Sequence, residues 1–126
     1  MKWAQTKGGT YGSTSAATVV SLSYTPLFTG STIYYAAWIN GMTSHQGVNY
    51  YVNALKNGVD VSSWVYFKGH GPPEHYLQYM AATKMITTFA NPASGTAISL
   101  SVTVAAYPDF PFYNGHTGIL AWEIVG

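Results

Sequence analysis

Apolar and polar residues alternate along several short stretches of the chain, and a repeat of two residues is typical of a β-strand with one buried face. In segment 19–24, Val20, Leu22 and Tyr24 fall on one side and serines fall on the other. Segment 97–105 shows the same alternation, with isoleucine, leucine and valine opposite serine and threonine. Both segments are therefore predicted to be strands that cover one side of a core.

Other segments do not alternate so simply. Segment 33–39 carries isoleucine, tyrosine, alanine and tryptophan at consecutive positions, which predicts a strand covered on both faces. Further strands are predicted at 47–55, 59–67 and 118–125. Segment 76–89 has helical spacing in its first half and β-branched residues in its second, and we interpret the second half as a strand.

Glycine, proline and asparagine mark the breaks between these strands. Asn57-Gly58 lies between two β-prone segments, and this pair favours a type I′ hairpin because both central residues take positive φ. Pro26 ends the strand before it, since proline has no N–H to donate to a sheet. Segments 68–75 and 107–116 hold several prolines and glycines and are predicted to be long loops.

About seven or eight short strands separated by turns, with no internal repeat, indicate an all-β fold. We expect an antiparallel β-sandwich of the jelly-roll-like kind, although a closed barrel fits the same pattern. Residues 1–17 are rich in glycine, serine and threonine, which predicts an irregular lead-in or a junction to upstream polypeptide. Residues 18–126 then form a single sandwich domain.

Charge is scarce in this chain. Charged residues make up 7% of the 126 residues, compared with about 25% in an average soluble protein, whereas aromatic residues make up 16%. The net charge of +1 is too small for a nucleic-acid binder, which must neutralise many phosphates. No apolar stretch is long enough for insertion into a membrane. A surface with so few charges predicts that copies of the chain cover part of it.

The acidic residues give little support for a catalytic function. The chain has 4 carboxylates, Asp60, Glu74, Asp109 and Glu123, and a glycosidase needs two of them about 5–9.5 Å apart. Glu74 and Asp109 belong to the two long loops and are the pair most able to meet. No nucleophile elbow of the Gly-x-Ser-x-Gly type is present. We therefore predict that the protein is not an enzyme.

The histidines raise the question of metal binding. His70, Glu74 and His75 stand in one loop, which brings two imidazoles and a carboxylate close together in sequence. Their spacing matches no helix-borne zinc motif, and a chain without cysteine can have no thiolate site. We predict no bound cofactor, and whether histidines from three copies meet at a threefold axis stays open.

Aromatic and polar residues gather in the two long loops. Rings there present an apolar face and a polar edge, which suits sugar rings and protein surfaces, and loops on a rigid sheet often carry recognition. The alternative is that these rings plug the end of the sandwich or stack on a neighbouring subunit. The predicted ligand-binding residues are His70, Glu74, His75, Tyr76, Asp109, Tyr113, Asn114 and His116.

Several segments resemble a known family: Thr25-Pro26 followed by Ser31-Thr32-Ile33, the hairpin segment 55–58, and the closing segment 118–124. With them the chain resembles the C-terminal receptor-binding tip of bacteriophage tail fibres, a jelly roll similar to C1q and tumour-necrosis-factor domains. The resemblance implies a homotrimer on the virion, with the last strand near its axis and residues 1–17 leading from an upstream fibre. It also implies binding to a bacterial surface polysaccharide or outer-membrane component, and no catalysis.

Loops 68–76 and 107–116 are richer in proline and aromatic residues than expected for a generic member of that family. No ligand-binding residue is therefore transferred from the family by position. Two other functions stay open, a structural trimerisation or capsid-decoration domain without a receptor, and a lectin-like carbohydrate-binding module. We expect a location on the virion or otherwise outside the cell.

Overall fold

The computed structural model describes residues 1–43, 49–61, 67–68, 78–90, 94–106 and 111–125. Its regular elements are all strands, and among the described residues there is no helix that could cross a membrane. The strands are β1 (Lys2–Lys7), β2 (Thr10–Tyr11), β3 (Ala17–Tyr24), β4 (Thr32–Thr43), β5 (Asn49–Lys56), β6 (Val59–Asp60), β7 (Phe67–Lys68), β8 (Gln78–Ala90), β9 (Ile98–Ala105) and β10 (Phe112–Ile124).

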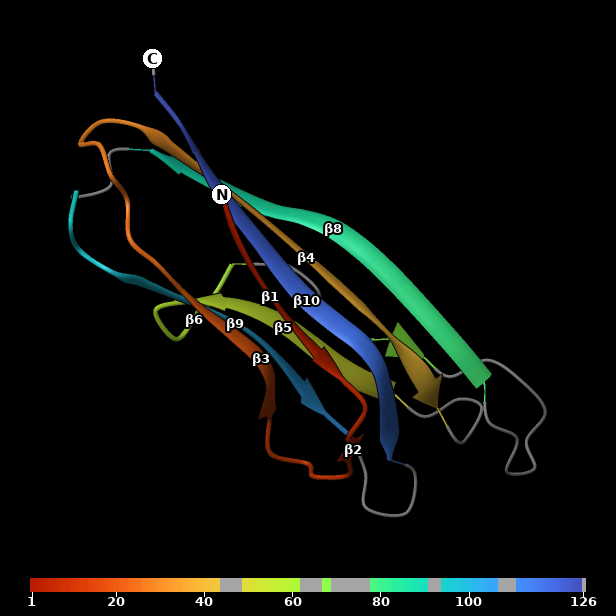
Figure 1. The fold of residues 1–126 in the computed structure, drawn as a ribbon. Helices are drawn as coiled ribbons and strands as arrows, with labels where there is room; N and C mark the ends of the chain where they lie inside the picture. The colour runs from red at the N-terminus through yellow and green to blue at the C-terminus, as the bar shows by residue number, and fades with distance from the viewer. Residues whose placement is uncertain (44–48, 62–66, 69–77, 91–93, 107–110, 126) are drawn as a thin grey trace.

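The strands form two antiparallel sheets that pack face to face (Figure 1). Sheet A has the order β1-β10-β4-β8, with β2 also paired to β10. Sheet B has the order β3-β9-β5-β6, with β7 also paired to β5. Each sheet therefore brings together strands from both halves of the chain. The predicted antiparallel β-sandwich is confirmed, in preference to a closed barrel.

The core lies between the sheets and is built from the inward-facing positions of alternating strands. Ile33 and Tyr35 of β4 are fully buried, and so are Leu100 and Val102 of β9. Tyr35 spans the core, because its hydroxyl donates a hydrogen bond to the backbone carbonyl of Ser101 in the opposite sheet at 3.1 Å. Burial raises the pKa of this phenol well above its ordinary value. The alternation seen in segments 19–24 and 97–105 thus marks the residues that fill this core.

The hairpin predicted at Asn57-Gly58 is confirmed. Asn57 has φ 49 and Gly58 has φ 81, which is the pair of positive angles that a type I′ turn requires. The turn joins β5 to β6, with Leu55 opposite Asp60. The strands expected in segments 33–39 and 97–105 are also present, as β4 and β9, and β5 covers the described part of segment 47–55. The strand expected at 59–67 is shorter at its start, because β6 ends at Asp60, and residues 62–66 lie outside the described residues.

The prediction of an irregular lead-in over residues 1–17 is wrong. β1 pairs with β10 from Lys2↔Ala121 to Lys7↔His116, and β2 pairs with the beginning of β10. The pattern missed β1 because its inward-facing residues, Ala4 and Thr6, are small and do not give apolar alternation. Lys2 of β1 also links the two sheets, since its ammonium donates a hydrogen bond to the backbone carbonyl of Ser23 in sheet B at 2.9 Å.

Three strands extend further than expected. β10 begins at Phe112, although 107–116 was predicted to be a loop, and a register shift between Asn114 and His116 lets the strand continue through Gly115. β4 continues through Gly41, where a Cβ would clash with the ring of Phe112. The ambiguous segment 76–89 is strand from residue 78 onward, because β8 pairs with β4 along its whole length.

Candidate functional site

One end of the sandwich carries the strand ends that flank both predicted loops. Thr43 at the end of β4 is paired with Gln78 at the start of β8 and with Phe112 at the start of β10. In sheet B, Lys68 at the end of β7 is paired with Asn49 at the start of β5. We call this the loop end, and in Figure 1 it lies away from the marked N- and C-termini. The strand ends that flank the two predicted loops therefore lie at the same end of the sandwich.

The predicted ligand-binding residues divide into two sets. Those in the first loop and at the start of the second lie outside the described residues: His70, Glu74, His75, Tyr76 and Asp109. The other members, Tyr113, Asn114 and His116, are described and all belong to β10. Because β10 is a strand, these neighbours do not share one face of the sheet.

Asn114 faces inward, which corrects its assignment to a ligand-binding surface. Its side chain is 6% exposed, and its amide nitrogen donates to the carbonyls of Thr6 at 3.1 Å and Gly8 at 3.0 Å. The hydroxyl of Thr117 donates to the amide oxygen at 2.6 Å. Both amide donors are thereby used inside the protein, and the side chain connects β10 to the end of β1 and to Gly8, which follows β1.

Tyr113 faces outward from sheet A, close to the loop end. It is 37% exposed, and it lies opposite Met42 of β4 and Thr10 of β2. Met42 is exposed as well. The two side chains give this corner of sheet A an apolar and aromatic surface that a partner or ligand can reach.

His116 also faces outward, and both its side chain and its backbone are hydrogen-bonded to neighbouring strands. Its Nδ1 lies 3.1 Å from the side-chain nitrogen of Gln5, and its backbone N–H donates to the side-chain oxygen of Asn40 at 2.7 Å. Among the described residues no group of three or more histidine, aspartate or glutamate side chains lies close enough to hold a metal ion. A single chain therefore offers His116 no ready-made metal site in its described part.

The outer face of sheet A is aromatic. The rings of Tyr34 and Trp122 stack with centroids 5.3 Å apart and an interplanar angle of 10°. Trp3 and Leu120 lie opposite each other on β1 and β10, and Trp38 lies opposite Gly118. We call Trp3, Tyr34, Trp38, Leu120 and Trp122 the aromatic face. The sequence pattern missed it because the pairing of β1 with β10 was not foreseen.

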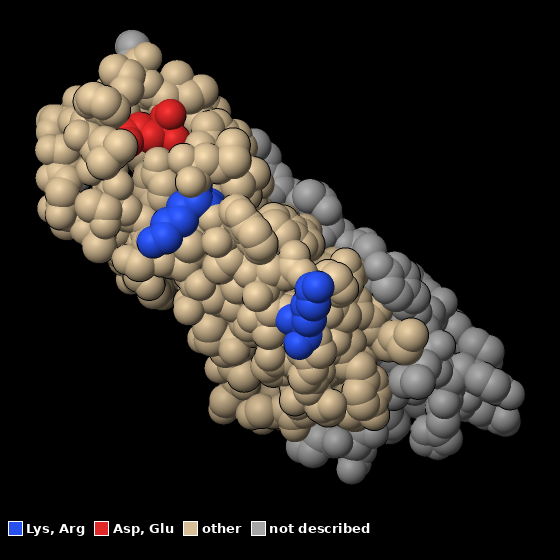
Figure 2. Space-filling view, viewed as in Figure 1, with Lys and Arg blue, Asp and Glu red and all other residues tan. Residues whose placement is uncertain are grey.

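Few charges interrupt this surface. At the outward-facing positions of β1, β4 and β10, Lys7 is the one charged side chain. Figure 2 shows isolated blue and red groups separated by wide areas of uncharged side chains. An uncharged surface that contains several large rings favours contact with another apolar surface.

The part of the outer face of sheet B that β3 and β9 form is different in kind. Serines lie opposite each other across β3 and β9, in the pairs Ser21↔Ser101 and Ser23↔Ser99. Thr18 continues the same row and is exposed. This hydroxyl face can hydrogen-bond to water, so the two faces of the sandwich suit different surroundings.

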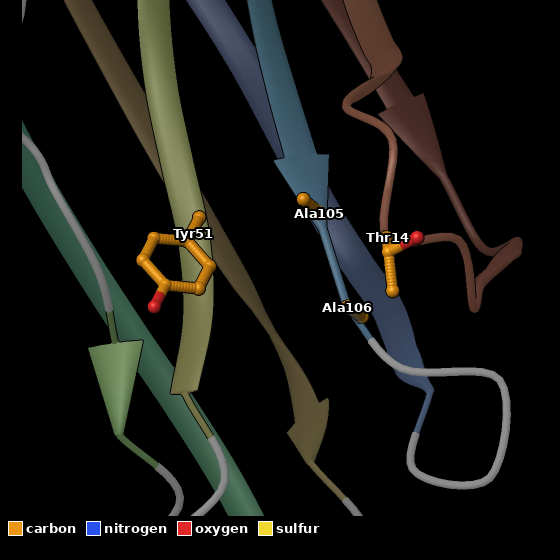
Figure 3. Close-up of a pocket in the computed structure, with 4 residues that line it drawn as sticks. All are labelled: Thr14, Tyr51, Ala105 and Ala106. Carbon is orange, nitrogen blue, oxygen red and sulfur yellow. The ribbon is translucent and has the colours of Figure 1, made fainter.

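A small pocket opens at the loop end of sheet B. Thr14, Tyr51, Ala105 and Ala106 line it, and its volume is about 60 Å³. Figure 3 shows the Tyr51 ring and the Thr14 side chain on opposite sides of the two alanines. No sequence motif marks these residues, because they come from three separate segments of the chain.

Glu123 has a structural role at the other end of the sandwich. The backbone N–H groups of Leu27 and Phe28 donate to its carboxylate at 2.9 and 3.1 Å, and the hydroxyl of Ser31 donates to it as well. The hydrogen bond from Ser31 is the main reason that the pKa of Glu123 lies below its usual value. This carboxylate therefore holds the turn between β3 and β4.

The chain was compared with protein-family models and with curated proteins. No protein-family model matches the chain, and a search of curated proteins also finds no match.

Proposed function

We propose that this chain forms the receptor-binding tip of a bacteriophage tail fibre. It acts as a homotrimer that binds a polysaccharide or an outer-membrane component on the bacterial surface. The antiparallel β-sandwich supports this function because the family resemblance implies a sandwich of the jelly-roll kind. Since one fold serves many functions, the proposal rests on the surfaces of the molecule and not on its fold alone.

The aromatic face is the observation that carries the proposal. Trp3 is exposed, and Tyr34 and Trp122 on the same outer face are partly exposed. An isolated domain therefore presents these rings to water, which promotes association. Permanent interfaces between subunits are enriched in aromatic residues and depleted of charge. Covering this face with two further copies accounts for both features, and it leaves the hydroxyl face in solvent.

Both marked termini lie away from the loop end (Figure 1). In this proposal the loop end is the part of the sandwich that faces a host surface.

The proposed contacts follow from these surfaces. His70, Glu74, His75, Tyr76 and Asp109 remain candidates from the sequence, since their segments join the sandwich at the loop end. Tyr113 lies at the border between the loop end and the aromatic face. Asn114 is omitted because its amide is used internally, and His116 is assigned to the subunit interface.

Two measurements test the proposal. Analytical ultracentrifugation should give three times the chain mass of 13.6 kDa, and labelled protein should stain host cells. The double variant Tyr76→Ala/Tyr113→Ala should remain trimeric and lose staining, whereas Ser21→Ala on the hydroxyl face should keep both properties. A monomer at micromolar concentration would contradict the assembly, and full staining by the double variant would contradict the proposed contacts.

A purely structural trimerisation or capsid-decoration domain is the second candidate. Two of the three described candidate residues favour it, because Asn114 is buried and His116 is hydrogen-bonded to Gln5. In that case the purified protein forms the trimer but neither stains host cells nor competes with phage adsorption.

A further inference from the structure

The turn between β3 and β4 exposes two adjacent apolar side chains. Leu27 is 75% exposed and Phe28 is 51% exposed. Segment 25–31, which contains both residues, has no charged residue. The turn lies at the end of the sandwich remote from the loop end (Figure 1). This end of the molecule therefore carries an apolar surface of its own, in addition to the aromatic face.

Hydrogen bonds hold the backbone of this turn in one conformation. The N–H groups of Leu27 and Phe28 donate to the carboxylate of Glu123 at 2.9 and 3.1 Å. The hydroxyl of Ser31 donates to the carbonyl of Phe28 at 3.0 Å. These bonds use backbone groups of the two apolar residues, so their side chains take no part in them. A surface that is already ordered loses little conformational entropy when a partner covers it.

The proposed trimer needs a surface that lies against the aromatic face. In a closed ring of three copies the contacts are heterologous, which means that two different surfaces of the chain meet at each contact. The aromatic face supplies one of these surfaces. An uncharged, apolar surface elsewhere on the same chain is the chemical match for it, and the exposed pair Leu27 and Phe28 has this character.

The turn and one end of the aromatic face lie at the same level of the sandwich. Glu123, whose carboxylate holds the turn, directly follows Trp122 in β10. Trp122 lies opposite Tyr34 of β4. A threefold axis along the strands, near which the family resemblance places the last strand, keeps each residue at the same height in every copy. The height of the turn therefore matches that of Tyr34 and Trp122.

We propose that Leu27 and Phe28 of one copy pack against the stacked rings of Tyr34 and Trp122 in the neighbouring copy. The inference rests on the proposed trimer and adds to it the surface that covers this part of the aromatic face. Tyr34 and Trp122 are partly exposed in the single chain, so ring surface is available to the neighbour. Phe28 contributes a third ring, and aromatic rings attract one another in offset and edge-to-face contacts.

Removal of the two side chains tests the contact. Leu27→Ala/Phe28→Ala keeps the backbone hydrogen bonds to Glu123, so circular dichroism should show an intact fold. Ultracentrifugation over a concentration series should show assembly weakened by roughly 30-fold or more, as for the loss of central interface residues. Val59→Ala shortens an apolar side chain that is 64% exposed on β6 and is the matched control, which should assemble like wild type. A folded double variant that assembles as tightly as wild type would overturn the inference.

Cross-linking tests which surfaces meet. The chain has no cysteine, so introduced thiols are the only ones present. Untagged Leu27→Cys is co-expressed with tagged Ala36→Cys, whose thiol lies on the aromatic face opposite Leu120, and a short bis-maleimide is added. A product with one tagged and one untagged chain should form, but not when Ser21→Cys on the hydroxyl face replaces Ala36→Cys. If Ala36→Cys does not fold, Trp3→Cys places a thiol on the same face. No such product from a mixture that remains trimeric would overturn the inference.

The inference and the proposed function can fail separately. A wild-type trimer that stains host cells and is unaffected by Leu27→Ala/Phe28→Ala would refute the contact while supporting the adhesin. A wild-type trimer that stains no host cells but dissociates in the double variant would support the contact and refute the adhesin. A wild-type monomer would refute the proposed assembly and the contact together.

Discussion

The indole ring of Trp38 occupies the space in which any side chain at position 118 would begin, so that only glycine fits opposite it in β10. Glycine in the middle of a strand is unfavourable because it loses more conformational freedom on folding than other residues. Its presence here allows a large ring to lie directly over the backbone of the neighbouring strand. The contact joins β4 to β10 at the centre of the aromatic face.

Replacing this glycine should destabilise the domain. Gly118→Ala forces the Trp38 ring away from β10, and overpacking of this kind costs about 1–3 kcal/mol of the free energy of unfolding. Urea denaturation of wild type and variant measures the difference. In the double variant Gly118→Ala/Trp38→Ala the clash is absent, so the alanine at position 118 should cost much less in that background. An equal cost in both backgrounds would contradict the proposed contact.

Trp3 offers a test of assembly that leaves the fold intact. It is 64% exposed in the single chain, so Trp3→Glu should change the stability of the monomer little. If the aromatic face is buried between subunits, the same change places a charge in the interface and removes a large ring, and such losses cost 2 kcal/mol or more, roughly 30-fold in affinity. Ultracentrifugation should show a shift from trimer toward monomer. Ser23→Glu on the hydroxyl face is the control and should remain trimeric.

Asn114 and Tyr113 are adjacent residues with opposite expected effects. Asn114→Ala leaves the carbonyls of Thr6 and Gly8 without their amide donor, which should cost about 1–3 kcal/mol of stability. Tyr113→Ala removes an outward-facing ring and should cost less. Thermal unfolding of the two variants compares them. A larger loss for Tyr113→Ala would contradict the structural role of the Asn114 amide.

The sequence predicted the parts of the fold in which side-chain alternation and turn chemistry act locally. β3 and β9 alternate because one face is in the core, and Asn57-Gly58 forms its turn because both residues accept positive φ. The start of β10 was missed because Asn114-Gly115 has the composition of a turn. There the Asn114 side chain bonds to the chain between β1 and β2, and a register shift accommodates Gly115.

The candidate surfaces were harder to predict, since they depend on pairing between distant segments. Trp3 joins the aromatic face only because β1 lies beside β10. The pocket needs Thr14, Tyr51 and Ala105 to meet at one end of the sandwich, and none of these residues is chemically conspicuous on its own. Periodicity reports which face of a strand is buried, but it carries no information about which strand lies next to it.

Glu123 makes the stability of the domain depend on pH in a predictable direction. Its pKa is lowered in the folded state, first by the hydrogen bond from Ser31 and then by the backbone N–H groups of Leu27 and Phe28. A carboxyl with a lowered folded pKa stabilises the protein above its unfolded pKa and loses this contribution as the pH falls through the folded value. The wild-type midpoint of thermal unfolding should therefore decrease as the pH falls below the ordinary value of 4.5.

Glu123→Gln isolates this contribution, because glutamine keeps an acceptor oxygen for the turn but cannot titrate. At neutral pH the variant should unfold at a lower temperature than wild type, and the difference should shrink as the pH falls below 4.5. The nearby charged and titratable groups are the N-terminal ammonium and Tyr24, whose pKa is raised mainly by burial and further by the negative charge of Glu123. Tyr24 stays a neutral phenol throughout this acidic range. A constant difference between the two proteins from neutral pH to about pH 3 would show that the ionised carboxylate is not what holds the turn between β3 and β4.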